Sequence, residues 1–395
     1  MTRRWTVGPG VVVAAVIILL FGIWLGGHPN NLPSPMRGGF FQSRNLAVVN
    51  QAMNILASRY YRSLPRSGLV NGALSGMVTT LDDPYSHYLD PRAYRERSEE
   101  RSRQFGGIGI TTVAEQAGLR VKEVVEHSPA ADAGLMPGDL ITKVGSTSLA
   151  GRAESTGTEL IRGPVGTSVK LTLARDGAPH EISVERAKIV VPVASWEMVT
   201  YHHQRIGHLT FTGFTAGSGN ELRSEVRAAL DAGADGLILD LRGNGGGLIN
   251  EAINVTSAFI AHGTIMSAQE RGRSRRVYVA HGDAIAPHIP MVVLVDQGTA
   301  SAAEIVTAAL KDHGRAEVVG TETHGKGVFQ TTERLSNGGA LDITVGRYFS
   351  PDGHSLGSGA RSGPGITPNV YARDDPDTSR DEALAVAERT VAAHR

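Results

Sequence analysis

Two short, uninterrupted apolar runs constrain the fold of this chain more than any other feature. They are DGLILD at residues 235–240 and IPMVVLVD at residues 289–296. A strand that is apolar at every position is covered on both faces, as in a parallel sheet between helices. Helical patterns at 216–232 and 250–262 alternate with these runs. We therefore expect an α/β core with a mainly parallel sheet over residues 188–372.

The composition excludes several function classes. The 395 residues include no cysteine, which rules out disulfides, thiolate metal sites and a cysteine nucleophile. The net charge is zero, so the overall balance gives no support for a general nucleic-acid binder, which carries a basic patch or stripe. The length predicts about two or three domains.

The N-terminus predicts a membrane anchor. Arg3 and Arg4 precede an apolar run at 7–27 that contains VVVAAVIILLFGIWL. About 20 such residues cross a bilayer, and the arginines would stay on the cytoplasmic side. A cleaved signal peptide is the alternative, but no small-x-small cleavage site follows Leu25. We expect a single-pass anchor with the catalytic part outside the cytoplasm, followed by a linker at 29–42.

Residues 43–103 read as a mainly helical subdomain. SRNLAVVNQAMNILASRYY places apolar residues at helical spacing. Tyr85, Tyr88 and Tyr94 cluster after a helix that Pro84 ends. These tyrosines predict a small aromatic core, and the sequence assigns them no chemistry.

Residues 104–187 change to a strand-rich pattern with tight glycine turns. Gly-Ile-Gly-Ile at 107–110 is followed in order by Ser-Pro-Ala at 128–130, Ala-Gly-Leu at 133–135 and Gly-Asp at 138–139. This order resembles a PDZ domain, and a plain β-domain is the alternative. The resemblance implies that a peptide C-terminus adds to the domain edge as a strand. Its carboxylate would be received by the backbone of one loop, formed by Gly106, Gly107, Ile108, Gly109 and Ile110.

Ser301 is the candidate nucleophile. It precedes the helical pattern AAEIVTAALKD, where free backbone N–H groups and the helix dipole favour an oxyanion. However, Ser301 and Glu304 also form a capping-box pattern, which begins many helices without any chemistry. The serine alone does not decide between the two interpretations.

Lys326 is the candidate base. It lies between two glycines and before VFQTTERL, which predicts a strand. Positions 326, 328 and 330 of a strand share one face, so Gln330 is expected to orient the lysine amine. A lysine in water titrates near ~10.4, so a catalytic lysine must be buried. His324 is an alternative base for the serine.

The same lysine invites a phosphate-loop interpretation. Residues 320–326 match G-x-x-x-x-G-K, but Gly327 stands where the motif needs serine or threonine. The motif also opens a helix, whereas a strand is expected here. No metal-ligand spacing such as H-E-x-x-H occurs among the histidines.

Taken together, these segments resemble the carboxyl-terminal processing peptidases, or tail-specific proteases, of peptidase family S41. The resemblance rests on GALSGMVTTLDDPYSHYL (72–89), LILDLRGNGGG (237–247), the Ser301 helix, VVGTETHGKGVFQ (318–330), RYFSPDGHSL and GITPNV. The sequence departs from the family at Gly245, usually proline, and at Thr299 and Ala303, usually serines.

The resemblance implies a multidomain α/β (α+β) protein with a ClpP/crotonase-like core and an inserted PDZ domain. It implies that Ser301 is the nucleophile, Lys326 the general base and Gln330 its orienting partner. The oxyanion hole would be the N–H groups of Ala302 and Gly246, and no metal or cofactor is needed. The expected domains are the anchor (1–28), linker (29–42), helical subdomain (43–103), PDZ domain (104–187), peptidase core (188–372) and C-terminal helix (373–395).

We expect a membrane-anchored serine endopeptidase that cleaves proteins near their C-termini. Its partners would be protein or peptide substrates with free, apolar C-termini, the membrane, and a second copy or an adaptor. The alternative from another class is an inactive, membrane-anchored PDZ scaffold that binds C-termini. The set of Ser301, Lys326 and Gln330 favours the enzyme, because a scaffold has no use for it.

Overall fold

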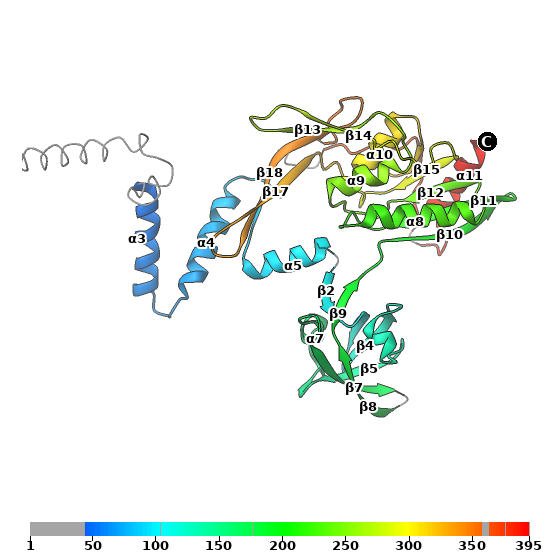
Figure 1. Cartoon of the computed structure of the whole chain (residues 1–395). Coiled ribbons are helices and arrows are strands. Elements are labelled where there is room, and N and C mark those ends of the chain that lie inside the picture. Colours follow the sequence, from blue (N-terminus) through cyan, green and yellow to red (C-terminus); the bar gives the residue numbers. More distant parts are fainter. Residues whose placement is uncertain (1–43, 103, 176, 358–362, 376, 395) are drawn as a thin grey trace, which may run out of the picture. The chain divides into compact units, whose positions relative to one another are not determined.

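The computed structural model describes residues 44–394 except 103, 176, 358–362 and 376 (Figure 1). The chain divides into two compact units, residues 1–78 and 79–395. Helix α3 (Arg44–Arg59) and helix α4 (Arg66–Thr79), apart from the last residue of α4, form the described part of the first unit. The first was expected from the spacing of its apolar residues, and the second was expected as the helix that Pro84 ends.

None of the helices in the described part of the chain is long and apolar enough to span a bilayer. The predicted anchor at 7–27 and the linker at 29–42 lie outside the described residues.

The second unit contains the expected mainly parallel sheet. Its six strands lie in the order β10-β11-β12-β15-β16-β19. Only the β10–β11 pair is antiparallel; the other four pairings are parallel. The strands are β10 (Ala194–Tyr201), β11 (Gln204–Phe211), β12 (Gly236–Asp240), β15 (Met291–Val295), β16 (Glu317–Gly320) and β19 (Val370–Tyr371).

Helices cover both faces of this sheet, which explains the two uninterrupted apolar runs. Leu237 and Leu239 of β12 pack in one buried cluster with α8 (Ser218–Asp231), α9 (Ile249–Ser257) and α10 (Ala302–Asp312). Ile238, between them, joins a second cluster with α11 (Glu382–Ala393) on the other face. Replacing a fully buried leucine such as Leu239 with alanine costs about 2–5 kcal/mol.

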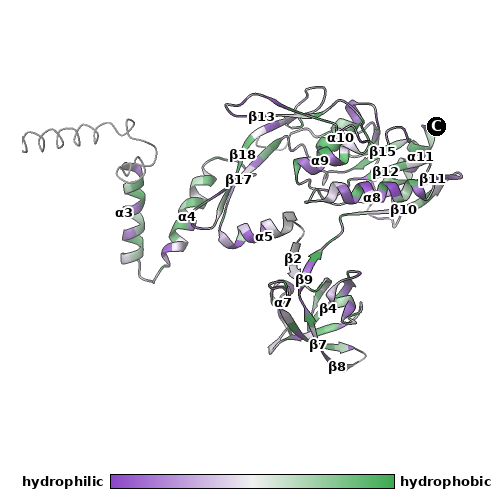
Figure 2. Cartoon of the chain, viewed as in Figure 1, coloured by the Kyte–Doolittle hydropathy of each residue, from purple (hydrophilic) through white to green (hydrophobic). Residues whose placement is uncertain are grey.

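A second, antiparallel sheet carries the lysine segment. Its path is β1-β18-β13-β14, and β17 also pairs with β18. The strands are β1 (His87–Leu89), β13 (Thr264–Glu270), β14 (Arg276–Val279), β17 (Val328–Arg334) and β18 (Ala340–Phe349). Strand β1 was not expected, and its pairing with β18 joins the segment before residue 90 to the core. Helix α5 (Pro91–Ser102) follows it and is hydrophilic along most of its length (Figure 2).

The strand-rich segment folds as a β-domain with its own core. Its sheet runs β3-β4-β5-β7-β8, and β6 pairs with β5. Leu119, Ile141 and Leu171 are among its fully buried side chains. The strands are β3 (Ile110–Glu115), β4 (Gly118–Val124), β5 (Leu140–Val144), β6 (Thr147–Ser148), β7 (Ser168–Arg175) and β8 (Ala178–Glu185). Helices α6 (Pro129–Asp132) and α7 (Glu154–Ile161) complete it.

The chain enters and leaves the β-domain through one antiparallel pair. Strand β2 (Gln104–Gly107) pairs with β9 (Ala187–Val190), with Gly107 opposite Ala187. The segment 108–186 is therefore an insertion whose two ends lie side by side.

Candidate active site

Ser301 lies at the turn between β15 and α10. Its backbone has φ 56° and ψ −113°, and the residue is only 8% exposed. A positive φ is uncommon outside glycine, and such strain costs on the order of 1–3 kcal/mol. The surrounding structure must therefore hold the serine in this conformation.

Two loops at the carboxyl ends of β12 and β15 hold that turn. Asp296 Oδ1 accepts the backbone N–H groups of Gly243, Gly298 and Thr299 at 2.8, 2.9 and 3.0 Å. Thr299 Oγ1 donates to the carbonyl of Leu241 at 2.8 Å. These bonds run between the glycine loop and the serine turn, so the two loops form one unit.

The glycine loop reaches the nucleophile candidate at Gly246. Its φ is 92°, and a Cβ there would lie 2.7 Å from the Ala302 nitrogen and 2.9 Å from Ser301 Cβ. Only glycine allows this approach. The Gly246 N–H donates to Asn244 Oδ1 at 2.9 Å, and Asn244 is itself buried and donates to the carbonyl of Phe211 at 2.7 Å.

The two expected oxyanion donors therefore differ. Within the described residues the Ala302 N–H makes no hydrogen bond, as the first N–H groups of a helix have no partner inside it. The Gly246 N–H is engaged by Asn244. The expectation treated both as available, but an asparagine two residues before the glycine folds back onto it, which the sequence did not reveal.

Glu304 joins the serine turn to the lysine loop. Its side chain is fully buried. Oε2 accepts the backbone N–H of Ser301 at 2.7 Å and that of Lys326 at 2.9 Å. Oε1 accepts the Thr323 hydroxyl at 2.6 Å and the Gly325 N–H at 2.7 Å. A carboxylate with four donors in a dry site fixes all four groups, because losing any bond would leave a buried polar group unsatisfied.

Lys326 is half-buried between the loop and an aromatic ring. Its Nζ lies 4.7 Å from the centroid of the Tyr85 ring. The Tyr85 hydroxyl lies 3.4 Å from His324 Nε2. An aromatic face at this distance attracts a cation. Tyr85 therefore belongs to the site, although the sequence assigned it no chemistry.

Lys326 lies just before the strand that carries Gln330, since β17 begins at Val328. The register shift beside Gln330 lies on the partner strand, because Phe329 pairs with Gly346 and Gln330 with Thr344. Val328 and Gln330 therefore share a face of β17, whereas the alternation does not extend to Lys326, and the orienting role of Gln330 stays a prediction. The Gln330 amide donates to Thr344 Oγ1 of β18 at 3.0 Å.

The phosphate-loop alternative is not supported. Residues 321–327 connect β16 to β17, so the Gly-Lys pair opens a strand, as expected. A phosphate-binding loop of this type must open a helix, because the helix N-terminus contributes to phosphate binding.

A charge network with a buried centre at His208 and Asp240 lies behind the glycine loop. Arg242 bonds Asp240 at 2.7 Å and Asp381 at 2.8 Å, which ties the end of β12 to the start of α11. His208 lies between Asp240 and Glu197, each at 3.1 Å. Burial lowers the pKa of His208, but the hydrogen bonds to these carboxylates outweigh it, and the pKa is raised. Burial likewise opposes the charge of Asp240, yet His208 and Arg242 hold its pKa below the usual value.

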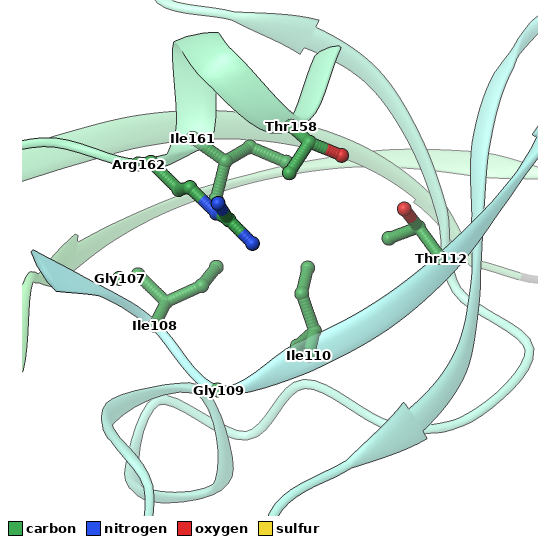
Figure 3. Close-up of a pocket in the computed structure, with 8 residues that line it drawn as sticks. All are labelled: Gly107, Ile108, Gly109, Ile110, Thr112, Thr158, Ile161 and Arg162. Carbon is green, nitrogen blue, oxygen red and sulfur yellow. The ribbon is translucent and has the colours of Figure 1, made fainter. Parts of the chain in front are cut away.

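The β-domain carries a small pocket at the loop expected to bind a carboxylate (Figure 3). Ile108 and Ile110 point into it from below, and the Arg162 guanidinium points into it from above. The loop is held by the Ile108 and Gly109 carbonyls, which accept N–H groups of Ala130 and Val125 at 2.8 and 2.9 Å. Gly107, Thr112, Thr158 and Ile161 complete the lining.

Three residues of these sites were not singled out for function by sequence reasoning. Glu304 was recognised only as a helix cap, and its spacing from Ser301 carried no hint of the lysine loop. Tyr85 lies far from Lys326 in sequence, and only the DPYS turn marked the segment. Arg162 follows the helix of the β-domain without any motif.

Comparison with known proteins agrees with this architecture. Family models match peptidase family S41 at residues 205–372, the N-terminal domain of the activating protease CtpB at 33–93, and a PDZ domain at 106–185. A probable CtpA-like serine protease of Staphylococcus aureus (strain bovine RF122 / ET3-1) is 33% identical, covering 96% of this chain and 73% of that protein. Its counterpart in Staphylococcus saprophyticus is 32% identical, covering 91% and 70%.

Solved structures show the same fold. The photosystem II D1 C-terminal processing protease matches with a TM-score of 0.52 and 24% identity, covering 88% of this chain and 98% of that one. At this identity the likeness concerns the fold alone.

Proposed function

The chain belongs to the serine peptidases of family S41, and we propose that it cleaves proteins near their C-termini with Ser301 as nucleophile and Lys326 as general base. The observation that carries this proposal is the Glu304 carboxylate. One of its oxygens binds the backbone of both residues, at 2.7 and 2.9 Å. A link of this kind supports a nucleophile and base that work at a fixed separation.

The chemistry is acyl transfer. The neutral amine of Lys326 takes the proton of Ser301 Oγ while Oγ attacks the substrate carbonyl carbon. The resulting tetrahedral oxyanion collapses, the C–N bond breaks, and the leaving amine takes the proton from the lysine ammonium. Water then attacks the ester, with Lys326 again receiving a proton, and releases the new C-terminus and the free serine.

The oxyanion would be bound by the N–H groups of Ala302 and Gly246. The Ala302 N–H lies at the start of α10, next to the nucleophile. The Gly246 N–H would have to exchange Asn244 for the oxyanion. Removing one donor of this kind typically slows catalysis by about 10²–10³-fold.

The PDZ domain would bind the substrate C-terminus. Ile108, Ile110 and Ile161 offer an apolar lining for the last side chain, and Arg162 adds a cation for the carboxylate. Peptides of this kind bind PDZ domains as an added strand, here along β3.

We further propose that residues 7–27 anchor the protein in a membrane and that the catalytic part lies outside the cytoplasm. The support is the apolar run itself and the two arginines before it. A ClpP/crotonase-like relationship of the core is part of the same proposal and rests on the sheet flanked by α8–α10 and α11.

The test compares cleavage of a fluorogenic peptide with a free apolar C-terminus. Ser301→Ala and Lys326→Ala should each lower kcat/KM by at least about 10³-fold. Lys170→Ala is a matched control, because this lysine is exposed on the β-domain and pairs only with exposed Glu181 in the described structure. Cleavage by Lys326→Ala at the wild-type rate would exclude the dyad. Binding of the peptide without turnover by the wild type would favour the scaffold function.

A further inference from the structure

The segment at residues 82–90, here called the strap, lies at the edge of the antiparallel sheet that contains β17 and β18. Its last part is β1, which pairs antiparallel with β18: His87 lies opposite Asp342 and Leu89 opposite Ala340. The strap belongs to the same compact unit as the catalytic core. It therefore reaches the site as part of the sheet and not as a loose loop.

The strap places Tyr85 over the lysine amine. The Nζ of Lys326 lies 4.7 Å from the ring centroid, and Tyr85 is half-buried. Its hydroxyl lies 3.4 Å from His324 Nε2. Tyr85 thus contacts two residues of the lysine loop, Lys326 through its ring and His324 through its hydroxyl.

A chain of hydrogen bonds fixes this tyrosine and continues to Gln330. Asp83 accepts the Tyr85 N–H at 3.0 Å and the Ser86 hydroxyl at 2.5 Å. Ser86 Oγ in turn accepts the Thr344 N–H at 3.0 Å, and Thr344 Oγ1 accepts the Gln330 amide at 3.0 Å. Burial opposes the charge of Asp83, but bonds from Ser86, Thr344 and the Tyr85 N–H lower its pKa, so the carboxylate stays ionised.

We propose that Tyr85 is a positioning residue that holds the Lys326 amine and favours its protonated form during proton transfer from Ser301. This inference rests on the proposed function of Lys326 as the base. The face of an aromatic ring attracts an ammonium more than a neutral amine. The amine is neutral before the attack and becomes charged as it takes the serine proton, so the ring contact is stronger in the transition state than in the reactive ground state.

Two effects on the pH profile of kcat/KM follow. Since the ring favours the charged amine, it moves the acid limb to higher pH, and removing it moves that limb to lower pH. Since the ring also stabilises the charge that forms in the transition state, removing it lowers the plateau. Two further titratable groups lie at the lysine loop: His324, whose Nε2 is 3.4 Å from the Tyr85 hydroxyl, and Glu304 on α10, whose Oε2 accepts the Lys326 backbone N–H.

The experiment measures full pH profiles of kcat/KM for the whole chain and for Tyr85→Leu, Tyr85→Phe and Tyr88→Leu. Tyr85→Leu should lose roughly three- to thirtyfold on the plateau, and its acid limb should move down by about half to one and a half pH units. Tyr85→Phe keeps the ring, so the acid limb of its kcat/KM profile should stay at the wild-type pH. Tyr88→Leu is the matched control, because Tyr88 lies on the same strap but bonds Asn337; its limb should not move.

Four results would overturn the proposal. A uniform loss in Tyr85→Leu with an unmoved limb would mean that the tyrosine only supports the fold. A shift in Tyr85→Phe equal to that in Tyr85→Leu would assign the effect to the hydroxyl and His324. Wild-type activity in Ser301→Ala would remove the proposed function and this role with it. An inactive Ser301→Ala beside an unchanged Tyr85→Leu would leave the proposed function standing and refute the tyrosine alone.

Discussion

Ser301 and Lys326 are joined through one atom, because their backbone N–H groups donate to the same carboxylate oxygen, Glu304 Oε2. The two nitrogens therefore lie no farther apart than the combined lengths of two short bonds, 2.7 and 2.9 Å. The oxygen lies on the first turn of α10, three residues after the serine. The proposed nucleophile and the proposed base, which lie in the loops after β15 and before β17, are thus held by one helix start.

Replacing Glu304 with glutamine should impair both folding and catalysis. One half of the amide is an NH₂ group, which cannot accept from donors that now bond a carboxylate oxygen. Each buried donor left unsatisfied costs about 1–3 kcal/mol. We expect a lower thermal midpoint and a loss of kcat of about 10²-fold or more from misplacement of the base.

Thermal unfolding and peptide cleavage measure the two effects separately. Glu225→Gln serves as a control on the same core, since this glutamate lies on the partly exposed face of α8 and is distant in sequence from both loops. An unchanged kcat in Glu304→Gln would contradict the role given to the shared oxygen.

Gly246→Ala should lower kcat far more than Gly245→Ala. A Cβ at Gly246 would lie 2.6 Å from the Ala300 carbonyl oxygen and 2.7 Å from the Ala302 nitrogen, at a φ of 92°. At Gly245 the added methyl meets nothing within 4 Å. We expect a loss of about 10²–10³-fold in kcat for Gly246→Ala, with little change in KM. Steady-state kinetics of Gly246→Ala and Gly245→Ala test this prediction. Equal losses of kcat in the two variants would refute the oxyanion role of Gly246.

Much of the fold could be predicted from the sequence, because the apolar pattern of a segment reflects which of its own faces are buried. The runs at 235–240 and 289–296 became β12 and β15 because both faces of each strand are covered by helices. The strand after Lys326 was also predicted correctly. The environment of the site could not be predicted in the same way. The four bonds of Glu304, the Tyr85 ring and the Asn244 bond join residues whose contact depends on tertiary structure.

Gln330 illustrates the limit of periodicity. The period of two applies only within a strand, and Lys326 lies before β17, which begins at Val328. Periodicity alone therefore could not place the lysine and Gln330 on one face.

The PDZ pocket should require a free C-terminus. Amidation of a peptide removes the negative charge that the loop at 106–110 and Arg162 would receive. We expect amidation to weaken binding by about tenfold or more, since hydrogen bonds to a charged group contribute about 1.5–3 kcal/mol. Binding can be measured by fluorescence anisotropy with Ser301→Ala, which should not consume the ligand. Equal affinity for both peptides would contradict recognition of the C-terminus.

His208 should make stability depend on pH near neutrality. Its pKa is raised in the folded protein, so the group contributes stability that is fully present below its unfolded value of about 6.5. That contribution is lost as the pH rises through the raised folded value. Asp240 and Asp381 have lowered pKa values in the folded protein, so the stability that they contribute is lost as the pH falls into the acid range.

Chemical denaturation of the wild type and His208→Asn between about pH 5 and 9 isolates this contribution. The difference in unfolding free energy should shrink as the pH rises. A difference that stays constant or grows over that range would show that the charged form of His208 is not the one favoured by Asp240 and Glu197.

The rate at which an organophosphonate labels the protein tests the central claim most directly. Such a reagent reacts with an activated serine, and the adduct is located by mass spectrometry. We expect one adduct per chain, on Ser301, formed at least about 10²-fold more slowly in Lys326→Ala and at the wild-type rate in His324→Ala. Labelling of Lys326→Ala at the wild-type rate, together with its loss in His324→Ala, would contradict the Ser301–Lys326 dyad.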